Sequence, residues 1–503
     1  MDDHQPQSIS RRVAETLSLS PDAGAVAYEG AWTSWAALAD GARKIEAVLC
    51  AAGVPRSAPV GWMARKSPTA VAAFASLLLS GRPIAPLRPT QSLVGLQDEI
   101  RAQALQAIVA DELDWALEGV QAAARQAGSL GVTVSGRQAF QAGLQPGLEC
   151  IGPGPHRPDA PGMVVERVSS GTTGLPKRIP VSSEALVLAL RSAEVAASSG
   201  RAQAPLRMKT SPAVIVAPFG HASGVFALLF ALYQARPIIV LDRFTVDGWV
   251  DAVRRHKPRS ASLVPTMIRM VLEADVPPHA LSSLSAIHCG TASLDPEEQD
   301  AFESRFGVPI LIDYGAAEFI GGVAGWSLAD HRRFGDAKRG SAGRPRLDVL
   351  VRTVDPQTSA VLSPGEIGLL EIRAKRFGPA WIRTTDLASL DEDGFLYIHG
   401  RADDAINRGG FKILPDEVAA VLRLHPGVGD AAVVGIPDPR LGQVPIALIE
   451  ALGAPVDSAV LESFARERLA AYQVPVEFRF VDVLPRTTTL KVSRPELKSL
   501  LGI

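Results

Sequence analysis

The chain has 503 residues, which is too many for one ordinary hydrophobic core, so two or more domains are expected. Its 51 Lys and Arg residues nearly balance its 53 Asp and Glu residues, and no basic block stands out. This balance argues against a surface for nucleic acid or for an anionic membrane. The longest apolar runs, such as residues 70–79, are too short to span a bilayer.

The cysteines and the N-terminal residues bear on the cellular compartment. Cys50, Cys150 and Cys289 are far apart and odd in number, so they predict neither a disulfide framework nor a Cys-pair metal site. Residues 1–12 are polar with an acidic start, unlike a signal peptide. We therefore expect a protein of the reducing cytoplasm.

Helical patterns alternate with short apolar runs along most of the chain. Apolar spacing predicts helices over residues 34–53 and 68–81. Strands are expected over residues 58–64, 82–87, 163–168, 213–219, 237–241, 260–265, 286–290 and 308–315. This alternation predicts an α/β fold, with parallel sheets covered by helices on both faces.

The pattern changes in the last third of the chain. Residues 348–355, 366–373 and 394–400 read as alternating strands, and the chain after residue 401 reads as compact α+β. The polar, glycine-flanked residues 400–410 are the best boundary. We predict a large domain over residues 1–402, with a β-rich subdomain from about 340, and a small mobile domain over residues 403–503.

A loop rich in glycine and hydroxyl groups follows the strand expected at residues 163–168. It reads SSGTTGLPK and spans residues 169–177. Backbone N–H groups and hydroxyls in such a loop can bind phosphate oxygens, and a lysine adds a mobile charge. The loop lacks the P-loop pattern, and taken alone it favours a plain surface turn, because loops of glycine and serine are common.

Taken with four later segments, this loop resembles the phosphate loop of the adenylate-forming superfamily of acyl-CoA synthetases, luciferases and carrier-loading adenylation domains. The chain departs from that loop at Arg178, where the family usually has glycine. The resemblance implies that the loop binds the phosphates of ATP through Ser169, Ser170, Gly171, Thr172, Thr173, Gly174 and Lys177.

Two further segments resemble the family's adenine and metal sites. In LIDYGAAEF, residues 311–319, Tyr314 matches the aromatic residue on adenine and Glu318 the carboxylate for Mg²⁺, whereas Ala317 replaces the usual threonine. The segment from residue 286 to 297 resembles the lining of the adenine pocket, although serine replaces proline. Its matching residues are Gly290, Thr291, Ala292 and Ser293.

Two C-terminal segments resemble the ribose site and the lysine loop. The resemblance assigns Asp386 to the ribose hydroxyls, Arg401 to ribose or phosphate, and Asp403 to the hinge. Residues 391–393 read as a polar hairpin turn. In LPRTTTLKVSR, residues 484–494, Lys491 matches the catalytic lysine, and Leu490 replaces the family's glycine.

The acid and thiol sites are also placed by resemblance. His221 falls where amino-acid adenylation domains carry an aspartate, and a neutral imidazole binds ammonium poorly, so a simple carboxylic acid is favoured; a gate or a packed histidine are the other interpretations. Small residues nearby leave room for a ring-containing acid, or else serve backbone turns: Ala222, Gly224, Gly315, Ala316, Ala317, Gly321 and Gly322. Gly409 and Gly410 would flank the CoA tunnel.

The resemblance implies an ATP-dependent acid:CoA ligase that forms acyl-AMP, with ATP, Mg²⁺ and CoA as its cofactors and co-substrates. A carboxylic acid is the expected partner, no nucleic acid or membrane span is expected, and a homodimer is the assembly considered. One alternative is an enzyme that loads an acyl- or peptidyl-carrier protein. Another, motivated by Arg178, Ala317 and Leu490, is an acyl-adenylate-binding protein without turnover.

Overall fold

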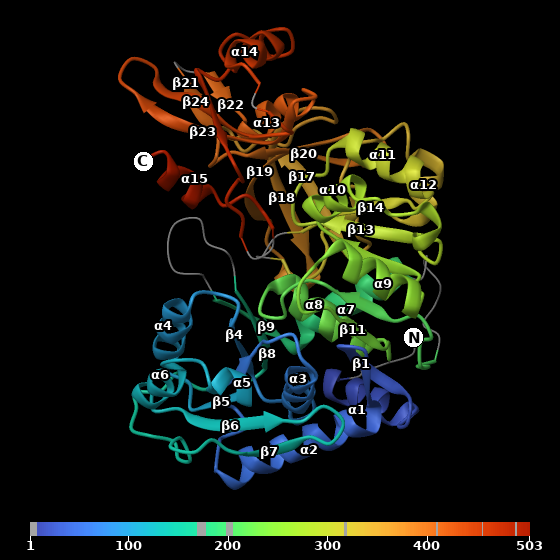
Figure 1. Cartoon of the computed structure of the whole chain (residues 1–503), viewed down its shortest axis with the longest axis vertical. Helices are drawn as coiled ribbons and strands as arrows, with labels where there is room; N and C mark the ends of the chain where they lie inside the picture. Colours follow the sequence, from blue (N-terminus) through green and yellow to red (C-terminus); the bar gives the residue numbers. More distant parts are fainter. Residues whose placement is uncertain are drawn as a thin grey trace.

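The computed structural model describes residues 8–168, 178–197, 205–315, 319–408, 411–454, 456–487 and 490–503. Within these ranges the strands form five sheets. Figure 1 shows the C-terminal elements at one end of the molecule and the first helices at the other. The α/β class predicted from the alternating pattern is confirmed, with mixed rather than purely parallel sheets.

The largest sheet has seven strands in the order β7-β6-β5-β3-β4-β8-β9. Its interior pairs are parallel, whereas β7 and β9 pair antiparallel at the two edges. The strands are β3 (Val60–Met63), β4 (Ile84–Leu87), β5 (Ala107–Asp111), β6 (Leu130–Ser135), β7 (Gln141–Leu144), β8 (Met163–Val168) and β9 (Arg178–Ser182). The phosphate-loop sequence therefore connects β8 to the edge strand β9.

Two smaller sheets complete the α/β part. One has the order β10-β11-β1-β2 and the other the order β12-β13-β14-β15-β16. The first contains β1 (Gly24–Tyr28), β2 (Ala31–Ser34), β10 (Ala213–Ile215) and β11 (Ile238–Val240). The second contains β12 (Ser260–Leu263), β13 (Ala286–Gly290), β14 (Ile310–Tyr314), β15 (Ala324–Gly325) and β16 (Arg344–Pro345).

Helices between the strands supply the apolar surface that these sheets bury. They are α1 (Ile9–Leu19), α2 (Trp35–Ala51), α3 (Pro68–Ser80), α4 (Leu93–Gln103), α5 (Glu112–Trp115), α6 (Val120–Gln126), α7 (Ser183–Ala197), α8 (Ala222–Tyr233), α9 (Val246–His256), α10 (Pro265–Glu273), α11 (Pro296–Phe306) and α12 (Leu328–Phe334), with 3₁₀ turns η1 (Pro278–Leu281) and η2 (Lys375–Phe377).

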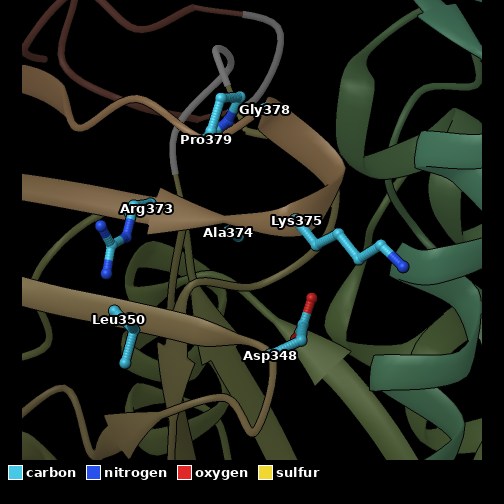
Figure 2. A pocket seen from close by; sticks show the side chains of 7 residues that line it. All are labelled: Asp348, Leu350, Arg373, Ala374, Lys375, Gly378 and Pro379. Atoms are coloured by element: carbon cyan, nitrogen blue, oxygen red, sulfur yellow. The ribbon is translucent and has the colours of Figure 1, made fainter.

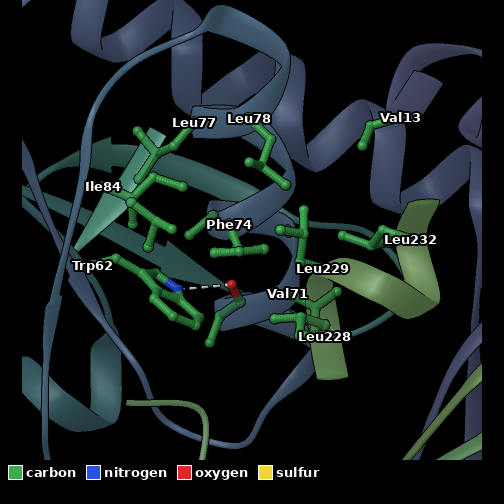
Figure 3. Close-up of a cluster of buried hydrophobic side chains, with 14 of the residues drawn as sticks. Val13, Trp62, Val71, Phe74, Leu77, Leu78, Ile84, Leu228, Leu229 and Leu232 are labelled. Carbon is green, nitrogen blue, oxygen red and sulfur yellow. Dashed lines mark hydrogen bonds between the residues drawn. The ribbon is translucent and has the colours of Figure 1, made fainter. Parts of the chain in front are cut away.

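Helix α3 explains the long apolar run that was too short for a membrane. It is buried almost all round, as expected of a helix that is apolar on every face. Figure 3 shows its side chains beside leucines of α8, with the indole N–H of Trp62 donating to the Ala70 carbonyl oxygen at 2.9 Å. None of the helices in the described ranges is long and apolar enough to cross a membrane.

The β-rich region forms an antiparallel sheet of β17 (Val349–Val354), β18 (Gly368–Ala374), β19 (Ile382–Leu390) and β20 (Leu396–Arg401). The polar hairpin turn expected at residues 391–393 is confirmed. One oxygen of Asp391 accepts from the backbone N–H groups of Asp393 and Phe395 at 3.0 and 2.9 Å, which closes the turn between β19 and β20.

The C-terminal part has its own sheet and core. Its strands are β21 (Ile406–Arg408), β22 (Phe411–Ile413), β23 (Val428–Asp438), β24 (Gly442–Ala451) and β25 (Glu477–Val481). Its helices are α13 (Pro415–Arg423), α14 (Ser458–Arg466) and α15 (Arg494–Leu500). The boundary predicted between residues 402 and 403 falls between β20 and β21, where the chain passes from one sheet to the next.

Candidate active site

Three predicted nucleotide-site residues come together from three strands. Tyr314 is the last residue of β14, and its hydroxyl donates to the carboxylate of Asp386 on β19. Asp386 is paired in register with Arg401 on β20. The α/β part therefore supplies the aromatic ring, and the β-rich sheet supplies the carboxylate and the guanidinium.

Arg401 also joins this group to the predicted hinge. Its guanidinium lies 2.7 Å from the carboxylate of Asp403 and 3.9 Å from that of Asp404. These contacts raise the pKa of Arg401, and the arginine in turn lowers the pKa of Asp403. Asp404 is also 3.5 Å from Arg494, the last residue of the lysine-loop segment.

Lys491 belongs to the C-terminal domain and is affected by the charges of this group. Its backbone is fixed by Thr487, whose N–H donates to the Lys491 carbonyl oxygen at 2.7 Å and whose hydroxyl accepts from the Lys491 N–H at 3.2 Å. The pKa of Lys491 is lowered, first because surrounding protein desolvates the ammonium and then through repulsion by Arg401, while Asp386 opposes the shift. Residues 386, 401 and 491 thus act on one another electrostatically.

The leucine before Lys491 keeps the backbone shape that glycine would have. Leu490 has φ of 60°, in the left-handed region that glycine enters without steric cost. The departure from the family pattern therefore changes the side chain and leaves a turn that glycine could also form.

The predicted adenine segment is strained at Thr291. This residue has φ of 75°, which is unusual for a β-branched side chain. Directly before it, a Cβ on Gly290 would lie 2.7 Å from the carbonyl oxygen of Asp313, so β13 and β14 approach closely there. Backbone strain of this kind is concentrated at functional sites.

Sequence reasoning missed a charged group beneath this segment. His288 Nδ1 lies 2.8 Å from the carboxylate of Asp313, which also pairs with Arg346. The carboxylate raises the pKa of His288, although burial works against that shift. The sequence offered only two hints of this pair. Asp313 immediately precedes Tyr314, and His288 and Asp313 lie on consecutive strands.

His221 is the residue immediately before α8 and caps its N-terminus. Its pKa is lowered to about 4, chiefly by burial and then by the charges of Arg88 and Lys491, with Glu99 opposing them. A pKa lowered this far leaves the imidazole uncharged at pH 7.

The small residues near His221 do not all leave space. A Cβ on Gly224 would lie 2.0 Å from the Pro218 carbonyl oxygen, so backbone packing explains this glycine. Gly321 has φ of 75°, and a Cβ there would lie 3.4 Å from Ala189 and 3.7 Å from the ring of Phe226. The turn explanation thus accounts for Gly224, and an aromatic side chain lies next to Gly321.

Arg178, the departure after the phosphate loop, is part of a buried ion-pair network. Its guanidinium lies 2.5 Å from Glu99 on α4 and 3.2 Å from Glu166 on β8, and it donates to the Pro86 carbonyl oxygen at 3.1 Å. Arg88 also pairs with Glu99, at 3.1 Å. The arginine thus ties the first residue of β9 to the helix and strands beside it.

Several predicted site residues lie outside the described ranges. They are the phosphate-loop residues 169–174 and 177, the acid and metal residues 316–318, and the tunnel residues 409 and 410. In the part of the chain that the structure describes, no group of three or more His, Cys, Asp or Glu residues could hold a metal ion. The metal role of Glu318 therefore stays a prediction.

A separate hollow lies at the ends of β17 and β18. It has a volume of about 290 Å³ and is lined by residues that include Asp348, Arg373 and Lys375 (Figure 2). Asp348 is already paired with Arg376 and accepts from the hydroxyl of Ser192 at 2.6 Å. No predicted site residue lines this hollow.

Comparison with models of protein families identifies the family of this chain. The model of the AMP-binding enzyme family matches residues 13–377, and that of the AMP-binding enzyme C-terminal domain matches residues 417–491. The chain belongs to the AMP-binding enzyme family. The predicted superfamily is thereby confirmed, and both predicted domains carry a match.

Relatives of this AMP-binding enzyme include acid–CoA ligases. The chain is 32% identical to sulfoacetate–CoA ligase of Cupriavidus necator over 68% of each chain. It is 33% identical to 2-succinylbenzoate–CoA ligase of Bacillus licheniformis, over 56% of this chain and 60% of the relative. By its family and these relatives, the chain is an acid–thiol ligase of the AMP-forming class.

Solved structures share the fold over nearly the whole AMP-binding enzyme. ATP-bound MatB from Rhodopseudomonas palustris superposes with a TM-score of 0.82 at 23% identity, covering 98% of this chain and 99% of that one. An amide bond synthetase from Marinactinospora thermotolerans gives 0.80, also at 23% identity, covering 98% and 100%. Such different enzymes share this fold, so the fold alone does not determine the acceptor.

Replacing Arg178 with the family's glycine tests the buried network. We expect Arg178→Gly to lower the free energy of unfolding by about 1–3 kcal/mol, because Glu99 and Glu166 lose charged hydrogen bonds but keep other arginines. Urea denaturation measures the change. The control is Arg137→Ala, which removes an exposed pair with Glu29 at 2.6 Å and should cost less than about 1 kcal/mol. Equal losses would contradict a buried structural role for Arg178.

The strain at Thr291 predicts that a substitution by glycine stabilises the protein. Thr291→Gly should raise the free energy of unfolding by up to about 1 kcal/mol, because relief of about 1–2 kcal/mol is partly offset by the freedom of glycine in the unfolded chain. Ala292→Gly is the matched control, since residue 292 lies outside the left-handed region and should lose stability. If both variants lose stability in thermal denaturation, Thr291 is not strained.

Proposed function

We propose that this enzyme activates a hydrophobic carboxylic acid with ATP and transfers the acyl group to CoA. One observation carries the proposal: Tyr314, Asp386 and Arg401 come together from three strands of the large domain, and the charges of Asp386 and Arg401 act on Lys491 of the C-terminal domain. A cation supplied by a separate domain, beside a carboxylate and an arginine, suits a site where two anions must meet.

The first step joins an acid carboxylate to the α-phosphate of ATP. One carboxylate oxygen forms a bond to the α-phosphorus while the bond to the bridging oxygen breaks, and pyrophosphate leaves. Both reactants are anionic, so fixed cations stabilise the charge that builds up, and their positions in the fold supply orientation. We assign the reacting phosphate to Lys491 and the ribose hydroxyls to Asp386, with Tyr314 against adenine.

The described residues fit a nucleotide at this position. Asp386 offers carboxylate oxygens to a vicinal diol, and the charges of Arg401 and Lys491 favour a polyanion. The o-succinylbenzoate CoA synthetase of Bacillus subtilis, which has the same fold, has been solved in complex with ATP and a magnesium ion. Mg²⁺ would neutralise phosphate charge here, and we assign Glu318 to hold it.

The second step transfers the acyl group to a thiol. The sulfur of CoA bonds to the acyl carbon, the bond from that carbon to the AMP oxygen breaks, and the thiol proton is lost to solvent. We assign Gly409 and Gly410 to the tunnel for the pantetheine arm, which the C-terminal domain would present after rotating about Asp403. This rotation removes Lys491 from the site once adenylation is complete.

A neutral histidine and aromatic side chains on the same helix favour a hydrophobic acid. A His221 imidazole that is neutral at pH 7 offers no charge to a substrate ammonium. Close to Gly321, Phe226 stacks on Phe230 with ring centroids 5.9 Å apart, which presents aromatic surface from α8. The relatives named for 2-succinylbenzoate also act on a ring-containing acid. A ring-containing acid is therefore the substrate class that we propose.

A panel of aromatic, alicyclic and medium-chain acids tests this function. We expect pyrophosphate release with at least one ring-containing acid, and acyl-CoA formation when CoA is added. Competition between CoA and a holo-carrier protein after adenylation identifies the acceptor. A failure of the whole panel to release pyrophosphate would instead support a binding protein without turnover.

Loss of the lysine should separate the two steps. We expect Lys491→Ala to reduce ATP–pyrophosphate exchange by at least about 100-fold, as for removal of a preorganised charge-stabilising group, and to reduce thioester formation from supplied acyl-AMP far less. Lys498→Ala, on α15 of the same domain, is the control and should leave both rates unchanged. Intact exchange in Lys491→Ala would exclude the adenylation role.

The ribose assignment predicts a change in ATP affinity. Asp386→Ala should raise the KM for ATP by about 10-fold or more, because hydrogen bonds to a charged acceptor contribute about 1.5–3 kcal/mol. Steady-state kinetics at saturating acid measures the effect. Asp393→Ala, at the tip of the hairpin that carries Asp386, is the control and should keep the KM. An unchanged KM in Asp386→Ala would remove this residue from the ribose site.

A further inference from the structure

Helix α10 of the large domain contacts the lysine loop directly. The hydroxyl of Thr266 on α10 donates to the carbonyl oxygen of Leu490 at 3.1 Å. The guanidinium of Arg486, also in the loop, donates to both groups, at 3.3 Å to the Thr266 hydroxyl and 3.4 Å to the Leu490 carbonyl oxygen. The residue beside Lys491 is thus held to the large domain through its backbone.

The Leu490 side chain adds an apolar contact. It packs against the hydrophobic cluster of the large domain that contains Met267, Ile268 and Val271 of α10. Leucine adopts the left-handed backbone here at a steric cost that glycine would avoid. A side chain kept at such a position suggests that its contact with the other domain offsets that cost.

An ion pair joins the same helix to the C-terminal domain. Arg269 Nη1 lies 3.1 Å from the carboxylate of Asp430 on β23, and both side chains are largely buried, at 18% and 8% exposed. Asp430 also contacts Arg486 of the lysine loop at 2.5 Å and Arg423 on α13 at 3.1 Å. One carboxylate therefore connects α10, the loop and the core of the small domain.

Each partner of this ion pair keeps another opposite charge when the pair is broken. Arg269 retains Glu298 on α11 at 2.5 Å, and Asp430 retains two arginines of its own domain. Breaking a buried pair is most costly when it leaves an unpaired charge, which this arrangement avoids. The contact suits a joint that opens and closes.

We propose that Leu490 and Arg269 are positioning residues that dock the lysine loop on α10 and hold the C-terminal domain in the adenylation orientation. Leu490 supplies the apolar anchor and Arg269 the ion pair. The rotation needed for thioester formation, which is itself part of the proposed function, must expose Leu490 and separate Arg269 from Asp430.

The docking itself can be measured without any substrate. Spin labels on Arg254→Cys of α9 and Ser463→Cys of α14, both exposed, report the separation of the domains after Cys50 and Cys150 are replaced by serine. Double electron–electron resonance then gives the distance distribution. We expect the unmutated chain to populate mainly the distance of the present structure.

Weakening either contact should shift that distribution. We expect Leu490→Gly and Arg269→Gln each to lower the ratio of docked to undocked molecules by at least about threefold. Arg269→Lys keeps the charge and should retain most of the docking. The control is Arg466→Ala, which removes an exposed pair within α14 and should change nothing. A docked fraction unchanged in both Leu490→Gly and Arg269→Gln would overturn the proposal.

Separate assays of the two half-reactions distinguish the docking proposal from the proposed ligase function. With an acid found in the panel, Leu490→Gly and Arg269→Gln should slow ATP–pyrophosphate exchange but not thioester formation from supplied acyl-AMP. Equal slowing of both half-reactions would contradict selective docking. If no acid is activated while the distance distributions shift as expected, the docking role stands and the ligase assignment fails.

Discussion

The site depends on a lysine and an arginine that belong to different domains and repel each other. Lys491 lies on a C-terminal loop, whereas Arg401 and Asp386 lie on β19 and β20. Asp386 and Asp403 offset part of this repulsion, and a further anion between the two cations would offset more of it. In the proposed function a polyphosphate is that anion, so substrate binding and the docked orientation of the C-terminal domain would stabilise each other.

The departures from the family pattern keep the fold by different contacts. Arg178 stands where the family usually has glycine, and its side chain forms ion pairs with Glu99 and Glu166. Leu490 replaces another glycine, keeps the left-handed turn, and adds an apolar contact with the large domain. Neither substitution by itself argues for lost turnover, because each has a structural role in the described part of the chain.

Local patterns predicted much of the fold because strands and helices follow from short-range periodicity. The strand over residues 163–168 and the hairpin turn after β19 were both expected, since neighbouring residues determine them. The ion pairs could not be predicted, because Glu99 and Arg178 are far apart in sequence and only the fold brings them together. The pair of His288 and Asp313 was missed for the same reason, since no spacing rule links adjacent parallel strands.

The leucine at the lysine loop sets a limit on how tightly the domains can dock. A two-step reaction in one site needs both orientations to be populated, and each additional 1.4 kcal/mol of docking reduces the undocked fraction about tenfold. An apolar contact stabilises docking, but a left-handed leucine weakens the loop that provides it. The two effects oppose each other at Leu490, which fits the proposed role of holding the lysine in place without preventing the proposed rotation.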